Sequence, residues 1–324
     1  MKKLSIIVPA YKVEDYIAAC LDSLLDQGLD HADYEIIVIN DGSPDNSKAI
    51  AEEYASRYSN IIVGDQENKG VSVARNHGLE MAQGEYIAFV DPDDTIYPKA
   101  LSRIIARAEE QHLDVVYLSL EVYDESGKLL QTMEPNGKDN VVLEGFLHPR
   151  RTFLSTLFRR SVIGNIRFKE GITRGQDTVF NAMVQSMSKR VGYCSLPYYR
   201  YLQRGSSSRQ FVGTERNFVS ALLAIETINN FQKANFPNPT DNQSEYFDDA
   251  MLIFVQRLLE WNIFPQKSQE NFNRLKKRLK ELGLGRLIKK MSKRFPMFDR
   301  SWTVFLTYLR LKYLSQRIRQ LFGL

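Results

Sequence analysis

Three aspartates directly follow an apolar run near residue 90 of the chain. Asp91, Asp93 and Asp94 come after residues 86–90, and a proline stands between Asp91 and Asp93. A run of β-branched and aromatic residues that ends in Pro and Asp predicts a buried strand breaking into a loop. Ligands bind at the carboxyl ends of strands in open α/β sheets. Crowded carboxylates at such a place predict a cation, because Mg²⁺ typically binds one or two carboxylates together with phosphate oxygens. The alternative is a solvated turn whose acids face water.

Two more predicted strands end in residues that suit the same ligand. The first, residues 4–9, leads to Tyr11, and the second, residues 34–39, leads to Asp41. In a parallel sheet these ends lie on one edge, so Tyr11, Asp41 and Asp91 would converge. An aromatic ring, a hydrogen-bonding acid and a metal-binding acid pair suit a nucleoside diphosphate. Neither a glycine-rich dinucleotide loop nor a Gly-Lys-Ser/Thr phosphate loop occurs, so the cation and side chains would hold the phosphates.

The first third of the chain alternates between strand and helix patterns. The predicted strands are residues 4–9, 34–39, 60–64, 85–90 and 115–122, and the predicted helices are residues 14–25, 45–58, 70–82 and 98–111. Ser43 or Asp45 is the predicted cap of the second helix. Repeated βα units predict a mainly parallel sheet with helices on both faces. Later residues predict a loop or lid over 134–145, helices over 152–162 and 177–188, a strand over 191–202, and successive helices from about 214.

The composition is that of an ordinary folded protein. Its 324 residues, 43% hydrophobic and 25% charged, suffice for one large α/β domain with an appendage or for two modest domains. The chain starts without a signal-peptide pattern, and no stretch approaches the ~20 apolar residues of a spanning helix. Cys20 and Cys194 lie far apart and the histidines show no paired spacing, which argues against a disulfide framework and a zinc site. We therefore expect a cytoplasmic protein.

Charge is divided unevenly along the chain. Residues 266–324 hold 16 Lys+Arg and 3 Asp+Glu, whereas residues 1–265 hold 27 and 36. This polarity predicts that the tail meets an anionic partner. An apolar stripe from Trp302 to Ile318, interrupted by arginines and a lysine, is typical of a helix lying on an anionic membrane surface. Packing of the stripe on the rest of the protein is the alternative. Nucleic acid is disfavoured, because the aromatic residues follow helical spacing rather than an exposed strand.

Four motifs occur in a characteristic order. They are residues 5–11 (Ser-Ile-Ile-Val-Pro-Ala-Tyr), 38–43 (Val-Ile-Asn-Asp-Gly-Ser), 68–76 (Asn-Lys-Gly-Val-Ser-Val-Ala-Arg-Asn) and 89–94 (Phe-Val-Asp-Pro-Asp-Asp). In this order and spacing they resemble glycosyltransferase family 2, over roughly residues 1–210. The resemblance implies the GT-A fold, an α/β fold with a Rossmann-like, mainly parallel sheet flanked by helices. It also implies inverting transfer of a sugar from a nucleotide sugar, most often UDP-linked, to a hydroxyl.

The resemblance also assigns roles to individual residues. Those that would bind the nucleotide are Pro9, Ala10, Tyr11, Glu14, Asp41, Gly42, Ser43, Lys69, Arg75 and Asp91. Asp93, together with Asp91, would bind Mg²⁺ or Mn²⁺. Arg200 and Arg204 would contact the diphosphate or the acceptor as a charge clamp. Solvated arginines at a strand edge are the alternative.

Inversion by direct displacement needs a base beside the acceptor hydroxyl, on the face opposite the leaving phosphate. The family usually places it in a Glu-Asp pair that opens a helix after a glycine. Here Gly175, Gln176 and Asp177 occupy that place, so the resemblance implies Asp177 as the base, with Gln176 where Glu is common. An acid that merely complements the helix dipole is the alternative. Glu170 is the next candidate for the base.

These inferences predict a metal-dependent transferase of single sugars to a glycan or lipid-linked acceptor in cell-surface polysaccharide synthesis. The Gln-x-x-Arg-Trp signature of processive synthases is absent. The predicted domains are a catalytic domain over 1–212, with a nucleotide-binding half (about 1–125) and an acceptor half (about 126–212), and a helical region over 213–324 with a basic tail from about 266. The tail would hold a cytoplasmic protein on the inner face of the membrane. A catalytically inactive nucleotide-sugar-binding subunit of a glycan assembly complex is the alternative.

Overall fold

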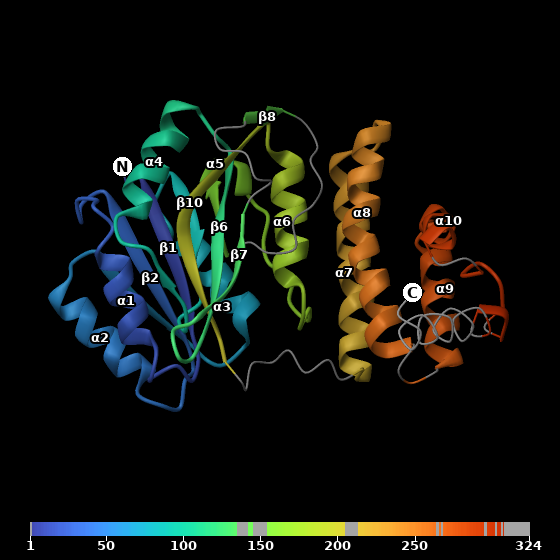
Figure 1. Ribbon diagram of the computed structural model, residues 1–324, viewed down its shortest axis with the longest axis horizontal. Coiled ribbons are helices and arrows are strands. Elements are labelled where there is room, and N and C mark those ends of the chain that lie inside the picture. Colours follow the sequence, from blue (N-terminus) through green and yellow to red (C-terminus); the bar gives the residue numbers. More distant parts are fainter. Residues whose placement is uncertain are drawn as a thin grey trace, which may run out of the picture. The chain divides into compact units, whose positions relative to one another are not determined.

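The computed structural model describes residues 2–134, 142–144, 154–204, 213–263, 266, 268–294, 297–301, 303–305 and 307. Internal contacts divide the chain into two compact units. Residues 1–170 and 176–208 form the first, and residues 171–175 and 209–324 form the second. The first is an α/β unit and the second is helical (Figure 1).

The α/β unit is built on one ten-stranded mixed sheet. Its strands are β1 (Leu4–Ala10), β2 (Tyr34–Asp41), β3 (Ile61–Gln66), β4 (Tyr86–Phe89), β5 (Thr95–Ile96), β6 (Val115–Asp124), β7 (Leu129–Met133), β8 (Val142–Glu144), β9 (Thr156–Arg159) and β10 (Arg190–Gln203). Its helices are α1 (Ile17–Leu25), α2 (Ser47–Arg57), α3 (Val71–Met81), α4 (Ala100–Glu110), α5 (Arg160–Ile163) and α6 (Gln176–Met187). The order across the sheet is β3-β2-β1-β4-β9-β6-β10-β5, with β7 beside β6 and β8 beside β10.

Among the described strands, six run in the same direction. β1 pairs in parallel with β2 and β4, β2 with β3, and β6 with β10, while the antiparallel β9 joins β4 to β6. The carboxyl ends of these strands therefore meet at one edge, where β1 ends at Ala10, β2 at Asp41, β4 at Phe89 and β10 at Gln203. We call it the carboxyl edge. It is the edge at which the sequence predicts a ligand.

Two hydrophobic cores hold the sheet between helical layers. On one face, Ile6 of β1 belongs to a core with Leu21 of α1 and Ile104 of α4. On the other face, Ile7 of β1 belongs to a core with residues of α3 and α6, including Phe180. Because successive strand residues point to opposite faces, one strand supplies both cores. The prediction of a sheet covered by helices on both faces is confirmed.

The prediction of a helix over residues 152–162 is wrong. Thr156–Arg159 forms β9, and only Arg160–Ile163 is helical; residues 152 and 153 lie outside the described part of the chain. β9 pairs with β4 and β6, and its Phe158 lies opposite Ile87 and is fully buried. Burial between two strands outweighs the local helical pattern. The loop predicted over residues 134–145 is wrong at Val142–Glu144, which is β8, while residues 135–141 and 145 are not described.

Two predictions about helix starts also need correction. α1 begins at Ile17 rather than at residue 14. Val13 N–H donates instead to Ser47 Oγ at the start of α2, and Glu14 N–H donates to the Asp45 carboxylate in the loop before it, so the predicted first turn is a loop. α2 follows Asn46, and neither Ser43 nor Asp45 is its cap residue.

The helical unit has its own core. Its helices are α7 (Glu215–Asn235), α8 (Asp241–Arg257), α9 (Gln269–Glu281) and α10 (Gly285–Arg294), with the π-helical segment η1 (Leu258–Ile263) after α8. Thr214 caps α7, and Thr240 forms a capping box with Gln243 at the start of α8. The prediction of successive helices from about residue 214 is confirmed.

One member of the predicted membrane stripe belongs to this core. Phe305 is fully buried and stacks on Phe272, with ring centroids 5.1 Å apart. Most of the stripe from Trp302 to Ile318 lies outside the described residues. Within the part of the chain that is described, no helix combines the length and the apolar character needed to cross a bilayer.

Candidate active site

An ion pair between Asp91 and Arg75 stands at the carboxyl edge, just after β4. Nη2 of Arg75, on α3, donates to Oδ1 of Asp91 at 2.7 Å. The arginine side chain is 4% exposed and the aspartate side chain 28%. Beneath the pair, the Arg75 guanidinium lies 5.5 Å from the centre of the Phe168 ring. The structure thus brings together two residues predicted to bind the nucleotide, and leaves the carboxylate partly exposed.

Asp93 lies where the loop after β4 meets the end of β10. Its carboxylate pairs with Arg204, which directly follows β10, and the Arg204 guanidinium lies 5.0 Å from the centre of the Tyr16 ring. The Asp93 side chain is 20% exposed. Burial and the neighbouring charge of Asp91 raise the pKa of Asp93. A cation at this carboxylate would therefore stabilise its charged form.

Asp94 has a structural place in the same loop. It is buried, and its carboxylate accepts hydrogen bonds from Tyr199 Oη and from Leu202 N–H, both at 2.8 Å. Burial and the charges of Asp91 and Asp93 raise the pKa of Asp94 to about 8. Both carboxylate oxygens thus take part in fastening the acidic loop to β10.

Asp41, at the end of β2, shapes the loop that leads to α3. Its carboxylate accepts hydrogen bonds from the N–H groups of Lys69 and Gly70, both at 2.9 Å. Gly42 has a φ of +61°, and a Cβ there would lie 2.7 Å from the backbone nitrogen of Asn68. Glycine is therefore required at this turn. Asp41 is only 3% exposed, and its hydrogen bonds fix the backbone at the exposed Lys69.

Hydrogen bonds join the loop after β1 to the loop after β2. Lys12 N–H donates to Ser43 Oγ at 2.8 Å, and Asn46 N–H donates to the Glu14 carboxylate at 2.9 Å. Burial opposes the charge of Asp45, but hydrogen bonds from Ser43 and a second serine prevail and lower its pKa to about 2. Glu14 and Ser43 are thus already engaged in holding the two loops together.

Tyr11 presents its ring at this junction. It is 42% exposed, and Lys12 Nζ lies 5.3 Å from the ring centre. Pro9 and Ala10 are buried in β1, so at most their backbone faces a ligand. The aromatic ring is therefore the accessible member of the first predicted motif.

A cavity of about 270 Å³ opens beside Asp93, between α1 and the ends of β6 and β10. Arg200 and Tyr123 line it together with Asp93. The Arg200 guanidinium lies 4.6 Å from the centre of the Tyr123 ring and 5.4 Å from that of Tyr97. The two predicted arginines, Arg200 and Arg204, are therefore both placed near the acidic loop.

Asp177 lies in the first turn of α6 and is partly buried. One turn later, Phe180 stacks on Phe168 with ring centroids 4.0 Å apart, and lies 5.7 Å from Phe89 at the end of β4. This packing ties the start of α6 to the strand end that carries the acidic loop. Glu170, the second candidate for the base, is exposed.

Residues 5–167 match the family model described as glycosyl transferase family 2. The chain belongs to this family. It is 38% identical over 217 residues to the Bacillus subtilis protein named uncharacterized glycosyltransferase EpsJ. The aligned region covers 63% of this chain and 62% of EpsJ. It is 29% identical over 273 residues to the B. subtilis minor teichoic acid biosynthesis protein GgaB. This aligned region covers 82% of this chain and 30% of GgaB. The chain thus spans less than two thirds of either relative.

The fold recurs in a solved structure. Staphylococcus aureus TarS 1–349 in complex with UDP-GlcNAc matches with a TM-score of 0.71 and 22% identity, over 95% of this chain and 92% of that chain. The match shows the fold, and the predicted GT-A-like architecture of this glycosyltransferase is confirmed. TarS is named a poly(ribitol-phosphate) beta-N-acetylglucosaminyltransferase.

The acidic edge of this family 2 glycosyltransferase fits a divalent cation that is shared with a substrate. Within the described ranges, no group of three or more His, Cys, Asp or Glu side chains is arranged to hold a metal ion. Asp94 is held by Tyr199 and by the backbone of β10, which leaves Asp91 and Asp93. Two carboxylates are the usual protein share for Mg²⁺ when phosphate oxygens complete its coordination. The residues therefore fit Mg²⁺ or Mn²⁺ bound together with a diphosphate.

Sequence reasoning missed several residues that support the site. Tyr199 joins the acidic loop to β10, Gln66 Nε2 donates to the Asp41 carboxylate at 2.8 Å, and Phe168 underlies Arg75. Tyr199 falls in a predicted strand, but the partner of its hydroxyl depends on pairing with a distant segment. Gln66 lies two residues beyond the predicted end of the third strand. Their residue types alone carry no signal of these contacts.

We expect Tyr199→Phe to destabilise the protein by about 1–3 kcal/mol, because it leaves buried polar groups without a partner. The Tyr199 hydroxyl accepts from Asp91 N–H at 3.0 Å and donates to Asp94 at 2.8 Å. Urea denaturation measures the change. Tyr198→Phe is the matched control, since the described residues offer no hydrogen-bond partner to the buried Tyr198 side chain. Equal free energies of unfolding for the two variants would contradict the role given to Tyr199.

Proposed function

We propose that this chain is an inverting, metal-dependent glycosyltransferase. It moves one sugar from a nucleotide sugar, in the first instance UDP-linked, to a hydroxyl of a glycan or lipid-linked acceptor in cell-surface polysaccharide synthesis. The observation that carries the proposal is the arrangement of two carboxylates, Asp91 and Asp93, with two arginines, Arg75 and Arg204, at one edge of the sheet. Residues of both charges at one place suit a diphosphate bound with a metal ion.

The donor lies across the ends of β1, β2 and β4. The exposed ring of Tyr11 stacks on the base, and the loop held by Asp41 carries Lys69 toward the ribose and phosphates. Arg200 and Arg204 face the diphosphate. The UDP-GlcNAc named in the TarS structure supports a UDP-linked donor. In this proposal residues 1–125 bind the nucleotide, residues 126–212 receive the acceptor, and residues 213–324 form the helical region.

Asp93 and Asp91 are the residues that would hold Mg²⁺ or Mn²⁺. The ion, when bound, offsets the negative charge that grows on the diphosphate as it departs. Arg204, already paired with Asp93, acts on the same charge. The protein thus needs no glycine-rich phosphate loop.

Transfer also requires that the acceptor hydroxyl lose its proton. Asp177 takes this proton, and the acceptor oxygen bonds to the anomeric carbon of the sugar. At the same time the bond from that carbon to the diphosphate oxygen breaks, and its electron pair leaves with the diphosphate. Attack from the face opposite the leaving group inverts the configuration. The buried Oε1 of Gln176, which has no hydrogen-bond partner among the described residues, supplies an acceptor for a substrate hydroxyl beside the base.

The names of the relatives favour catalysis over simple binding. EpsJ is named a glycosyltransferase and GgaB a teichoic acid biosynthesis protein. A catalytically inactive nucleotide-sugar-binding subunit is therefore not favoured. The name of GgaB supports an acceptor that belongs to a cell-surface polymer.

The helical unit offers a basic surface for peripheral binding to an anionic membrane. Lys280 of α9 and Lys289 and Lys293 of α10 are exposed, and within the described segments none of them forms an ion pair. On the opposite side of α10, Leu287 and Met291 are buried. We therefore assign membrane association to this lysine surface, in addition to the tail beyond it.

We expect the double charge reversal Lys289→Glu and Lys293→Glu to weaken binding to phosphatidylglycerol vesicles by more than about tenfold, because each lysine near an anionic surface contributes about 1 kcal/mol. Co-sedimentation at low salt measures the change. Lys189→Glu, at an exposed position of the α/β unit, is the control. Undiminished sedimentation of the double variant would exclude this surface as the membrane contact.

We expect Asp177→Asn to lower the transfer rate by about 10²–10⁴-fold, since loss of a general base has an effect of this size. Binding of UDP with Mn²⁺ should remain, because Asp177 lies on α6 and outside the acidic loop. Single-turnover transfer and calorimetry separate the two properties. Gln176→Glu is the companion variant and should be tolerated. Turnover of Asp177→Asn within a few-fold of the wild type would place the base elsewhere.

A further inference from the structure

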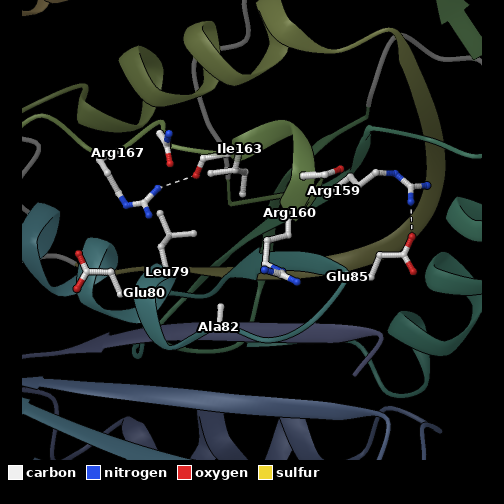
Figure 2. A pocket seen from close by; sticks show the side chains of 11 residues that line it. Leu79, Glu80, Ala82, Glu85, Arg159, Arg160, Ile163 and Arg167 are labelled. Carbon is white, nitrogen blue, oxygen red and sulfur yellow. Dashed lines mark hydrogen bonds and ion pairs between the residues drawn. The ribbon is translucent and has the colours of Figure 1, made fainter. Parts of the chain in front are cut away.

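The outer side of α3 carries two adjoining cavities within the α/β unit. One, of about 690 Å³, is lined by Gln66, Val73 and residues 168–170. The other, of about 750 Å³, lies between the end of α3 and residues 159–167 (Figure 2). Glu80 and Arg167 line both cavities. The two cavities therefore adjoin at these side chains, and we call them together the α3 groove.

Two lining residues at one end of the α3 groove, Gln66 and Phe168, contact residues of the candidate active site. Gln66, at its first end, is the residue whose amide holds Asp41. Phe168, which also lines this end, lies under Arg75 and stacks on Phe180, one turn beyond the candidate base. The groove then follows α3 from Val73 to the end of the helix, a length of about 14 Å at 1.5 Å per residue.

Two arginines in the α3 groove are held by backbone carbonyls rather than by the carboxylates of Glu80, Glu85 and Glu170, which also line the two cavities. Arg160 Nε donates to the carbonyl of Gly84 at 2.8 Å, and Arg167 Nη1 donates to the carbonyls of Gly164 and Ile166 at 2.9 and 3.0 Å. Within the described ranges neither of them forms an ion pair. Their guanidinium groups are thus held in place by neutral oxygens, with further N–H groups left over for a ligand.

A third arginine of the same segment, Arg159, differs from these two because it forms ion pairs. Arg159 pairs with Glu85 and lies 3.7 Å from Asp114, so its charge is balanced within the protein. In Figure 2, Arg159 turns toward Glu85, while Arg160 and Arg167 flank Leu79. Arg159 is therefore a structural arginine, whereas Arg160 and Arg167 remain available to bind an oxyanion.

The remaining lining suits a polyol between the charges. Leu79 and Ile163 supply apolar surface, and Ser161 and Asn165 supply polar groups in exposed positions. The exposed Glu80, at the junction of the two cavities, can accept hydrogen bonds from sugar or alditol hydroxyls. The lining thus combines positive groups with carboxylates and neutral hydrogen-bonding groups.

We propose that the α3 groove binds the backbone of an anionic acceptor polymer, a chain of polyols joined by phosphodiesters. Arg160 and Arg167 bind its phosphate groups through charge-assisted hydrogen bonds, and the chain runs along α3 toward Asp177. This inference rests on the proposed function, because it describes the acceptor of that transfer. It makes the two arginines acceptor-binding residues rather than catalytic ones.

The test is binding of a fluorescein-labelled glycerol-phosphate oligomer to the full chain, measured by fluorescence polarisation. We expect the double variant Arg160→Gln and Arg167→Gln to bind at least about tenfold more weakly, the loss typical of hydrogen bonds to charged groups. Ser161→Glu, which removes no hydrogen bond found in the structure, should weaken binding in the same direction through repulsion. Arg103→Gln, at an exposed position of α4, is the matched control and should bind as the wild type does.

Three outcomes would overturn the proposal. They are equal affinity of the wild type for a neutral dextran oligomer, unchanged binding by both groove variants, and displacement of the oligomer by inorganic phosphate at equal phosphate concentration. The last would mean a site for free anions only. UDP binding with Mn²⁺ is measured in the same samples. Absence of UDP binding in the wild type would count against the proposed transferase. UDP binding by variants that no longer bind the oligomer would support the groove.

Discussion

Balance of negative charge at the carboxyl edge is the constraint on which the rest of the site depends. Carboxylates that are partly removed from water are costly unless they are paired and hydrogen-bonded. Each aspartate of the loop after β4 has its own partner: Arg75 from α3, Arg204 from beyond β10, and Tyr199 within β10. These partners come from distant parts of the sequence, so the acidic loop reaches its final arrangement only when the whole α/β unit has assembled.

Aromatic packing fixes the position of α6 relative to the acidic loop. Phe89, the last residue of β4, contacts both Phe168 and Phe180 edge to face, with centroids 5.3 and 5.7 Å apart. Edge-to-face aromatic pairs contribute beyond their buried area and have defined geometry. The helix that begins with the candidate base is therefore fixed against the strand that ends in the candidate metal ligands. Both belong to the α/β unit, so their relation does not depend on the helical unit.

Local signals in the sequence predicted the central strands well, because β1 and β2 are buried along their whole length and appear as continuous apolar runs. β9 could not be predicted in this way, since its four residues become a strand only by pairing with β4 and β6. The acidic loop was found from its composition, whereas its partners Arg75 and Arg204 were reached only through the resemblance to a family. Tyr199 was missed, because strand register rather than residue type decides what its hydroxyl contacts.

The central claim is that the acidic edge binds a diphosphate and a divalent cation together. It is tested most directly by thermal unfolding of the wild type with UDP alone, Mn²⁺ alone, and both. Two carboxylates leave most positions around the ion to phosphate oxygens and water. A ligand that binds only the folded state raises the unfolding temperature, and tighter binding raises it further. We expect the two ligands together to raise the unfolding temperature by more than the sum of their separate effects. An equal stabilisation by UDP in the presence of EDTA would contradict the account.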